Sequence, residues 1–206
     1  ADMVRLSVET SVITVCSSPN SAPCTGMDEF GQIRYLGRAI RPDVAVITIV
    51  DDVHLSHFGS REDILRAKAE IFENLRPGGL AVLNGDDELL NTLHPDCGTV
   101  RCGLAASNSV RITELEDLGL EGVRCTIVTE KDSYPLFIPA PGVHMAALAA
   151  LAVAAAERLG LTREQGLRRP PAPSYLPAWR SASPPYAGRE SSHPPGRNVD
   201  WHCSCR

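Results

Sequence analysis

Seven consecutive residues, Val44–Val50, constrain the fold more than any other part of the sequence. The run reads Val-Ala-Val-Ile-Thr-Ile-Val, follows Arg41-Pro42-Asp43, and consists mostly of β-branched residues. It shows no alternation of polar and apolar positions, which is typical of a strand buried on both faces of a parallel sheet. Such a strand needs helices above and below it, so the run predicts an α/β fold.

A helix is predicted after this strand. Ser60 is a good N-cap, and Asp63, three residues later, occupies the acidic position of a capping box. Apolar residues then recur at helical spacing as far as Leu75, and Arg76-Pro77-Gly78-Gly79 ends the pattern. The sequence therefore predicts one helix over residues 60–75.

Further strands and helices are expected in alternation. In order they are the strand Leu80–Leu83, a short helix capped by Asn84-Gly85-Asp86-Asp87 and ending at Leu93, and the strand Thr99–Leu104. A meander over Ser109–Leu115, Gly122–Thr129 and Tyr134–Ile138 follows, then Pro139-Ala140-Pro141-Gly142 and an Ala-rich helix over His144–Leu159 that Gly160 stops. This order predicts a doubly wound, mostly parallel sheet with right-handed crossovers and a small antiparallel meander.

The two ends of the chain differ from its middle, residues 26–165, which form the predicted domain. Residues 166–206 hold eight of the sixteen prolines and little aliphatic bulk, so they cannot bury enough apolar surface to offset chain entropy. We predict that this tail is disordered, either as the product of a shifted reading frame or as a natural Pro-rich linker. Residues 1–25 match no domain. Within them Leu6–Val15 is a possible strand and Ser17–Pro23 a loop, and the initial Ala1 is compatible with a cut or processed chain.

Composition argues against several classes of function. The formal net charge is −5 and no run of Lys or Arg forms a basic stripe, which argues against nucleic-acid binding. No stretch of about 18 apolar residues would span a membrane, and no secretory signal pattern stands at the start. The seven cysteines are scattered, so we expect a reduced, cytoplasmic setting. Cys203 and Cys205 with His202 form either a metal site or part of a loose tail.

Polar residues stand where ligands of open α/β sheets bind, beyond the carboxyl ends of the strands. Asp51, Asp52 and His54 follow the first buried strand directly. Two carboxylates beside an imidazole can bind a divalent metal, carry a proton or only cap a loop. The residues alone leave these three interpretations open.

Lys68 is more informative because it falls on the apolar face of the predicted helix. It lies four residues after Ile64 and four before Phe72. Burial would favour the neutral amine, which can add carbon dioxide and become a carbamate, in effect a long carboxylate for metals. The chain has only two lysines, Lys68 and Lys131, against 18 arginines. The alternative is a lysine whose stem packs while its ammonium reaches solvent.

Several motifs in the middle of the chain stand in the order found in one family of enzymes. They are Gly26-Met27-Asp28-Glu29-Phe30-Gly31-Gln32-Ile33, Arg41-Pro42-Asp43-Val44-Ala45-Val46-Ile47-Thr48, His54-Leu55, Phe58-Gly59-Ser60, Ala67-Lys68-Ala69-Glu70-Ile71-Phe72-Glu73, Pro77-Gly78-Gly79, Leu83-Asn84-Gly85-Asp86-Asp87 and Pro141-Gly142-Val143-His144-Met145. With them the chain resembles the Mur ligases, ATP-dependent enzymes that join a carboxylate to an amino-acid amine in peptidoglycan synthesis. It is most similar to the members that add D-alanyl-D-alanine to the UDP-muramoyl-tripeptide.

The resemblance implies the fold of the family's central, P-loop NTPase-like domain and roles for three residues. Lys68 matches the carbamylated lysine of the catalytic site, which helps hold a magnesium ion, and His54 matches a metal-site histidine. His144 lies where the family approaches the adenine end of ATP. The implied cofactors are ATP and Mg²⁺, and the implied substrates are UDP-muramoyl-tripeptide and D-alanyl-D-alanine, joined through an acyl phosphate.

The sequence also departs from the family pattern. It contains no GxxxxGKS/T phosphate loop. Cys24, Ile49 and Asp51 stand in the places of the family's metal-binding Glu, an Asn and a Gly, and the Asn expected after His144 is missing. The family's amino- and carboxy-terminal domains are absent too.

We therefore expect a fragment or decayed copy of the ligase that is inactive alone. Two alternatives are a nucleotide- or metal-binding module without ligase chemistry, and a related amide ligase such as a folylpolyglutamate synthetase.

Overall fold

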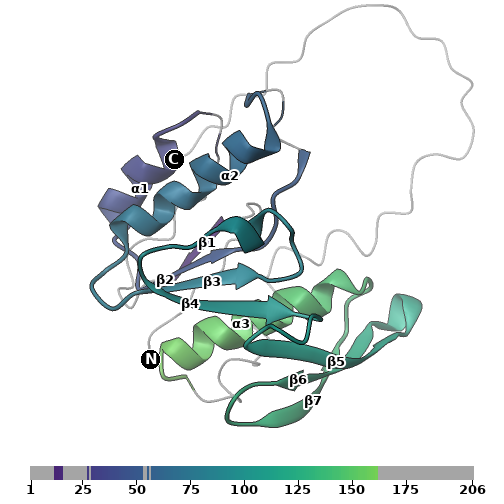
Figure 1. Ribbon diagram of the computed structural model, residues 1–206. Coiled ribbons are helices and arrows are strands. Elements are labelled where there is room, and N and C mark those ends of the chain that lie inside the picture. The colour runs from purple at the N-terminus through teal and green to yellow at the C-terminus, as the bar shows by residue number, and fades with distance from the viewer. Residues whose placement is uncertain (1–11, 16–26, 28, 53–54, 56, 162–206) are drawn as a thin grey trace, which may run out of the picture. The chain divides into compact units, whose positions relative to one another are not determined.

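The computed structural model describes residues 12–15, 27, 29–52, 55 and 57–161 (Figure 1). The expectations for Cys24, for His54 and for the tail 166–206 with its His202, Cys203 and Cys205 lie outside the described residues. Those expectations stay predictions.

A seven-stranded sheet forms the centre of the fold, and its strands lie side by side in chain order. The strands are β1 (Val12–Val15), β2 (Val44–Ile47), β3 (Leu80–Asn84), β4 (Gly98–Gly103), β5 (Val110–Asp117), β6 (Val123–Val128) and β7 (Ser133–Ile138). Strands β2 to β5 pair in parallel, whereas β1 pairs antiparallel with β2, and β5, β6 and β7 form an antiparallel meander. The predicted α/β class is confirmed, and the β4–β5 pairing makes the meander a continuation of the parallel sheet.

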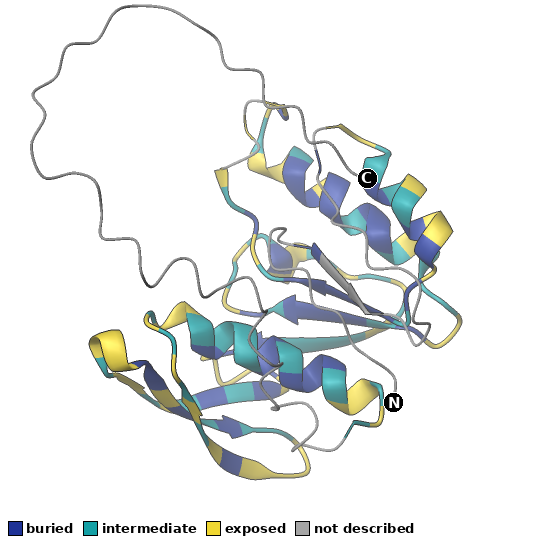
Figure 2. Cartoon of the chain, turned by 180° about the vertical axis from the view of Figure 1, so that it is seen from behind, coloured by how far each residue is buried: buried dark blue, intermediate teal, exposed yellow. Residues whose placement is uncertain are grey.

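Helices cover both faces of the sheet. One face carries α1 (Gln32–Ile40) and α2 (Arg61–Ala69), which continues into the 3-10 helix η2 (Glu70–Asn74). The other face carries α3 (His144–Arg158) (Figure 1). Two shorter 3-10 helices, η3 (Leu90–Thr92) and η4 (Gly119–Glu121), lie in connections. In Figure 2 the buried sides of the helices are turned towards the strands.

Strand β2 is buried on both faces, as its sequence predicted. All four of its residues are buried, and successive side chains belong to two different cores because side chains alternate along a strand. Ala45 and Ile47 pack with α1, α2 and η2, whereas Val44 and Val46 pack with α3.

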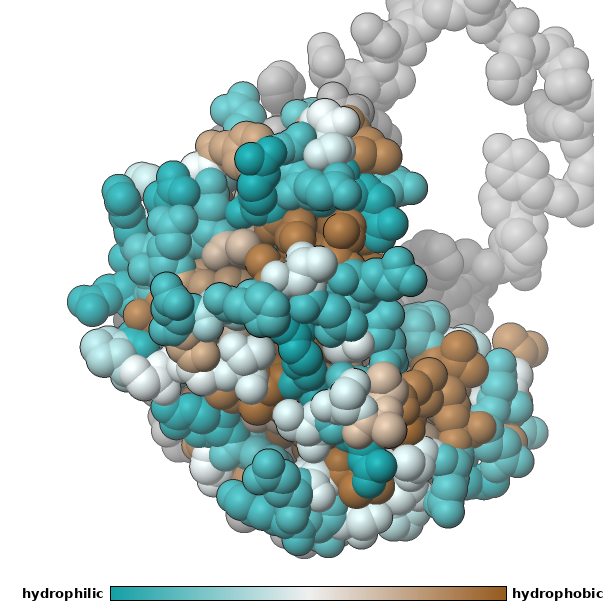
Figure 3. Space-filling view, viewed as in Figure 1, coloured by the Kyte–Doolittle hydropathy of each residue, from teal (hydrophilic) through white to brown (hydrophobic). Residues whose placement is uncertain are grey.

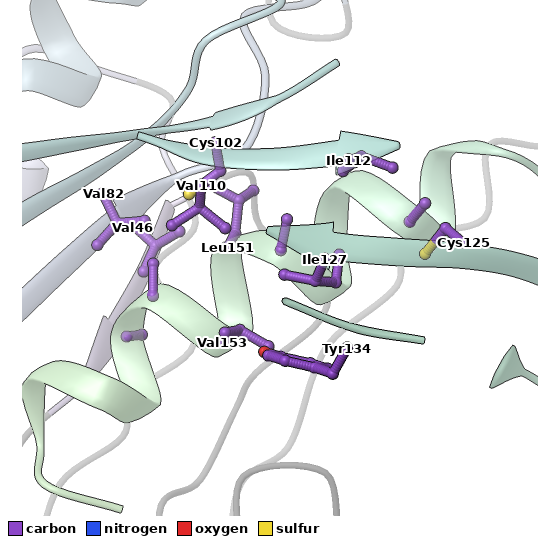
Figure 4. Close-up of a cluster of buried hydrophobic side chains, with 14 of the residues drawn as sticks. Val46, Val82, Cys102, Val110, Ile112, Cys125, Ile127, Tyr134, Leu151 and Val153 are labelled. Carbon is purple, nitrogen blue, oxygen red and sulfur yellow. The ribbon is translucent and has the colours of Figure 1, made fainter. Parts of the chain in front are cut away.

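The core under α3 extends along the sheet from β2 to β7. Figure 4 shows side chains from these strands gathered on Leu151 and Val153 of α3, from Val46 of β2 to Tyr134 of β7. The meander and the parallel strands therefore share one core through α3 and do not form separate modules.

Two sequence predictions of elements need correction, and one helix was missed. The helix expected over residues 60–75 is α-helical only to Ala69 and then tightens to 3-10 geometry. The short helix expected up to Leu93 is reduced to η3. Helix α1 was not predicted: it has no side-chain cap of its own and contains Gly37, whose missing side chain lets η2 approach so closely that a Cβ there would lie 3.1 Å from Asn74 Cβ.

The surface agrees with a chain that turns its apolar groups inward. Hydrophilic side chains are spread over the face shown in Figure 3, with intermediate and hydrophobic areas between them. Within the described part of the chain, no helix combines the length and the apolar character needed to cross a membrane.

Candidate functional site

Lys68 lies inside the core, on the apolar face of the helix where its spacing placed it, and its amine lies at the carboxyl edge of the sheet. The residue is 1% exposed, and its Nζ donates a 2.8 Å hydrogen bond to the carbonyl oxygen of Ile49, just beyond the end of β2. Burial lowers the pKa of Lys68, and the nearby carboxylates of Asp51 and Asp87 oppose this shift. The side chain therefore does not reach solvent, and its environment increases the fraction of neutral amine, the form that reacts with carbon dioxide.

The start of α2 fixes the direction in which Lys68 points. Ser60 caps the helix by accepting a 3.1 Å hydrogen bond from the backbone N–H of Asp63, and its hydroxyl donates to the Asp63 carboxylate at 2.9 Å. The hydrogen bond from Ser60 and a second from Arg66 lower the pKa of Asp63. This capping arrangement agrees with the sequence prediction, and it sets the phase of the helix so that Lys68 faces the sheet.

The turn Asn84-Gly85-Asp86-Asp87 after β3 connects three strand ends. Asn84 Nδ2 donates to the carbonyl oxygen of Thr48 at 3.0 Å, and Asp87 Oδ2 accepts from the backbone N–H of Val50 at 2.9 Å. Both bonds hold the residues that follow β2. Asp86 turns the other way and accepts from the backbone N–H groups of Leu104 (2.6 Å) and Ala105 (3.0 Å), which follow β4.

Gly85 is required in this turn by space. A Cβ at Gly85 would lie 1.8 Å from Oδ1 of Asn108, a buried side chain whose amide donates to Asp86. The loop after β4 thus packs directly against the turn backbone, and the turn is also hydrogen-bonded to the residues just after β2.

A cleft of about 770 Å³ opens at this edge. Its lining residues are Ile49, Arg61, Glu62, Asn84, Asp86, Asp87, Glu88, Leu89 and Thr92. Four of these are carboxylates and one is a guanidinium, so the cleft attracts cations and repels bare phosphate groups. The described lining therefore suits a divalent ion better than a bare phosphate group.

Asp51 and Asp52, the two acidic residues after β2, interact with different side chains. Asp52 pairs with Arg61, whose Nε lies 3.5 Å from its Oδ1, and Arg61 also donates to the carbonyl oxygen of Val50 at 2.6 Å. The negative charge of Asp51 acts to raise the pKa of Lys68, against the larger effect of burial. Among the residues that the structure describes, which omit His54, no three His, Cys, Asp or Glu side chains are grouped as a metal site. The metal-binding roles of His54 and Lys68 stay predictions.

His144 begins α3 and lies on the other face of the sheet from Lys68. It is exposed. The last residue of α3, Arg158, donates to the carbonyl oxygen of Gly78 just before β3, so the helix ends near the amino edge and begins towards the carboxyl edge. His144 and Lys68 thus approach the same edge from opposite faces, and the adenine role of His144 stays a prediction.

Sequence reasoning missed the function of Glu70 within the fold. This carboxylate is 6% exposed and accepts hydrogen bonds from the backbone N–H of Gly31 (2.9 and 3.0 Å) and of Arg34 (3.2 Å). It therefore caps α1 from a position 39 residues further along the chain. Only the acidic residue itself is visible in the sequence, since the contact is made by the tertiary fold.

Comparisons with known proteins agree with this architecture. Residues 25–156 match the model of the Mur ligase middle domain. The chain is 31% identical over 160 residues to UDP-N-acetylmuramoyl-tripeptide–D-alanyl-D-alanine ligase of Bacillus subtilis (strain 168), covering 76% of this chain and 34% of that protein. The ligase of the same name from Escherichia coli (strain K12) is 28% identical over 141 residues, or 66% of this chain and 31% of the relative.

Solved structures of similar proteins also share this fold. A crystal structure of MurF from Acinetobacter baumannii superposes with a TM-score of 0.65 at 27% identity, over 72% of this chain and 34% of that one. MurF ligase from Thermotoga maritima in complex with ADP shares the fold, with a TM-score of 0.59 at 22% identity over 71% and 35% of the two chains. The chain spans about a third of the length of the curated relatives that it matches.

Proposed function

Because the chain belongs to the Mur ligase family, whose middle domain it matches over residues 25–156, we propose that it is the ATP-handling part of a ligase that adds D-alanyl-D-alanine to UDP-muramoyl-tripeptide. One observation carries the proposal. Lys68, within the Ala-Lys-Ala-Glu-Ile-Phe motif, is 1% exposed and presents its amine at the carboxyl edge of the sheet, where ligands of such folds bind. Similarity to ligases of this specificity over 76% and 66% of the chain supports the choice of substrates.

The residues at the edge fit a divalent cation. In this proposal Lys68, as a carbamate, and His54 would hold Mg²⁺, and the carboxylates of the cleft would keep the local field negative. Bound Mg²⁺ would neutralise charge on the phosphates and on the acyl phosphate. The part of this chain is to hold the amine of Lys68 in a dry environment where it can be neutral.

The residues fit nucleotide phosphates less well. The cleft is lined by four carboxylates and one guanidinium, and the sequence holds no GxxxxGKS/T loop. A phosphate loop supplies several backbone N–H donors and a lysine, and removal of a single oxyanion donor typically costs about 10²–10³ in rate. We therefore propose that the chain by itself does not turn over ATP.

The proposal is tested with the full chain and with a chimaera. The purified chain, given Mg-ATP and both substrates, should release no ADP above a protein-free blank. In the chimaera, residues 27–161 replace the matching segment of the Bacillus subtilis relative, and we expect ADP release that depends on both substrates. Lys68→Met should abolish this ligation, whereas Lys131→Met, which changes the other lysine at an exposed position, should not.

Two results would overturn the proposal. One is a folded chimaera, with a native circular dichroism spectrum, that forms no ligation product. The other is ATP turnover by the chain alone that persists in the Lys68→Met variant.

A further inference from the structure

The peptide unit that joins Ile49 to Val50 is held at both of its polar ends. Its carbonyl oxygen, from Ile49, accepts the 2.8 Å hydrogen bond from Lys68 Nζ. Its N–H, from Val50, donates the 2.9 Å hydrogen bond to Asp87 Oδ2. A trans peptide directs its oxygen and its hydrogen to opposite sides. Lys68 of α2 and Asp87 of the turn after β3 therefore hydrogen-bond to the same peptide unit from opposite sides.

The two partners reinforce each other electrostatically. A hydrogen-bond donor at the oxygen and an anion at the hydrogen both polarise the peptide in the same sense, which strengthens each hydrogen bond. The effect is larger where water is excluded, as at the Lys68 end of this peptide, where the side chain is 1% exposed. Removal of one partner should therefore weaken the bond of the other.

The Asp87 carboxylate has a fixed orientation. Its Oδ1 accepts from the backbone N–H groups of Leu89 (2.9 Å) and Leu90 (3.0 Å), so Oδ2 is left to face Val50. The carboxylate of its neighbour Asp86 instead accepts hydrogen bonds from the loop after β4, at Leu104, Ala105 and Asn108. The turn thus places one of its two aspartates in line with Lys68.

We propose that Asp87 is a positioning residue that holds the Lys68 amine at the carboxyl edge through the Ile49–Val50 peptide. The consequence of this positioning for metal binding rests on the proposed function. A lysine carbamate keeps one N–H, which would donate to Ile49 in place of the amine, so Asp87 would help to hold a Lys68 carbamate that binds a metal ion.

The two lysines of the chain make the test direct. The full chain is labelled with lysine carrying ¹⁵N at Nζ and ¹³C at Cε, which gives one signal for Lys68 and one for Lys131, assigned with Lys68→Arg. Exchange of the Nζ protons with water is measured in the wild type and in three variants: Asp87→Ala, Asp87→Asn and Asp86→Asn. Lys131, which is exposed, serves as the internal reference.

We expect the Lys68 protons to exchange about ten- to a hundredfold faster in Asp87→Ala, as loss of a charge-assisted hydrogen bond would allow. Asp87→Asn keeps the shape and an acceptor, so it should give a smaller increase and preserve the fold if Asp87→Ala does not. Asp86→Asn should leave the Lys68 signal unchanged. In the reverse direction, Lys68→Met should accelerate exchange of the Val50 amide.

An unchanged Lys68 signal in both folded Asp87 variants would overturn the inference, as would an equal change in Asp86→Asn. The same samples are supplied with ¹³C-bicarbonate, so that a carbamate on Lys68 gives its own carbonyl signal. Its absence in the wild type would count against the proposed function and leave the coupling of Asp87 to Lys68 measurable. The two ideas therefore fail separately.

Discussion

Replacement of Glu70 by Ala tests how α1 is fixed to the segment that carries Lys68. The Glu70 carboxylate is the N-terminal cap of α1, because Gly31 at the N-cap position offers no side chain. It also lies 3.4 Å from the guanidinium of Arg34. The substitution leaves the N–H groups of Gly31 and Arg34 without their acceptor, in surroundings where Glu70 is 6% exposed.

The expected loss of stability follows from these contacts. A lost N-cap costs about 0.5–2 kcal/mol, and hydrogen bonds to a charged group contribute about 1.5–3 kcal/mol. Water can replace part of the lost hydrogen bonding at the helix end, and Arg34 keeps its two hydrogen bonds to Glu73. We therefore expect Glu70→Ala to lower the free energy of unfolding by about 2–3 kcal/mol. For a domain of this size that corresponds to a fall in Tm of about 5–10 °C.

Urea and thermal unfolding followed by far-ultraviolet circular dichroism measure the loss. Glu70→Gln should show about half of it, since one oxygen can still accept. Glu73→Gln is the matched control, because it shares the partner Arg34 from a side chain that is 51% exposed, and it should cost less than about 1 kcal/mol. Amide exchange should accelerate at residues 31–34 only in the Glu70 variants. If Glu70→Ala is no more destabilising than Glu73→Gln, the argument for a capping carboxylate is wrong.

Two further predictions concern packing and a buried thiol. Gly85→Ala should destabilise the chain by about 1–3 kcal/mol, because its Cβ would overlap Asn108, and the cost should shrink in an Asn108→Ala background in a double-mutant cycle of unfolding free energies. Burial raises the pKa of Cys102 to about 12 from an ordinary 9.0, so iodoacetamide at pH 8 should alkylate it only after unfolding, as peptide mass spectrometry can show. The stability linked to this thiol is present below pH 9 and is lost as the pH rises from 9 towards 12; alkaline unfolding that is identical in Cys102→Ala would contradict this.

The parallel core of the fold could be predicted because its signals are local. The uninterrupted apolar run of β2 and the capping pair Ser60 and Asp63 each specify their element within a few residues. The burial of Lys68 was predictable for the same reason, since helical periodicity placed it between Ile64 and Phe72.

The features that could not be predicted depend on contacts between residues far apart in the sequence. Helix α1 has Gly31 at its N-cap and Gly37 in its interior, so its stability comes from Glu70 and from packing on η2. The change of α2 to 3-10 geometry accompanies that same contact of Glu70. Lys68 and Asp87 both hydrogen-bond to the peptide unit between Ile49 and Val50. No spacing in the sequence predicts this arrangement.

The position of α3 has a consequence for the order in which the chain can fold during synthesis. This helix follows all seven strands in the sequence, yet it completes the core that lies along β2 to β7. On the ribosome, where residues are added at about 5–20 per second, one face of the sheet stays without its cover until residues 144–158 have emerged. During that interval the nascent sheet exposes the apolar side chains of Val44, Val46 and Val82, which makes it a substrate for chaperones and prone to aggregation. A nascent chain arrested before His144 should therefore be captured by a chaperone, whereas one arrested well beyond Arg158 should escape it.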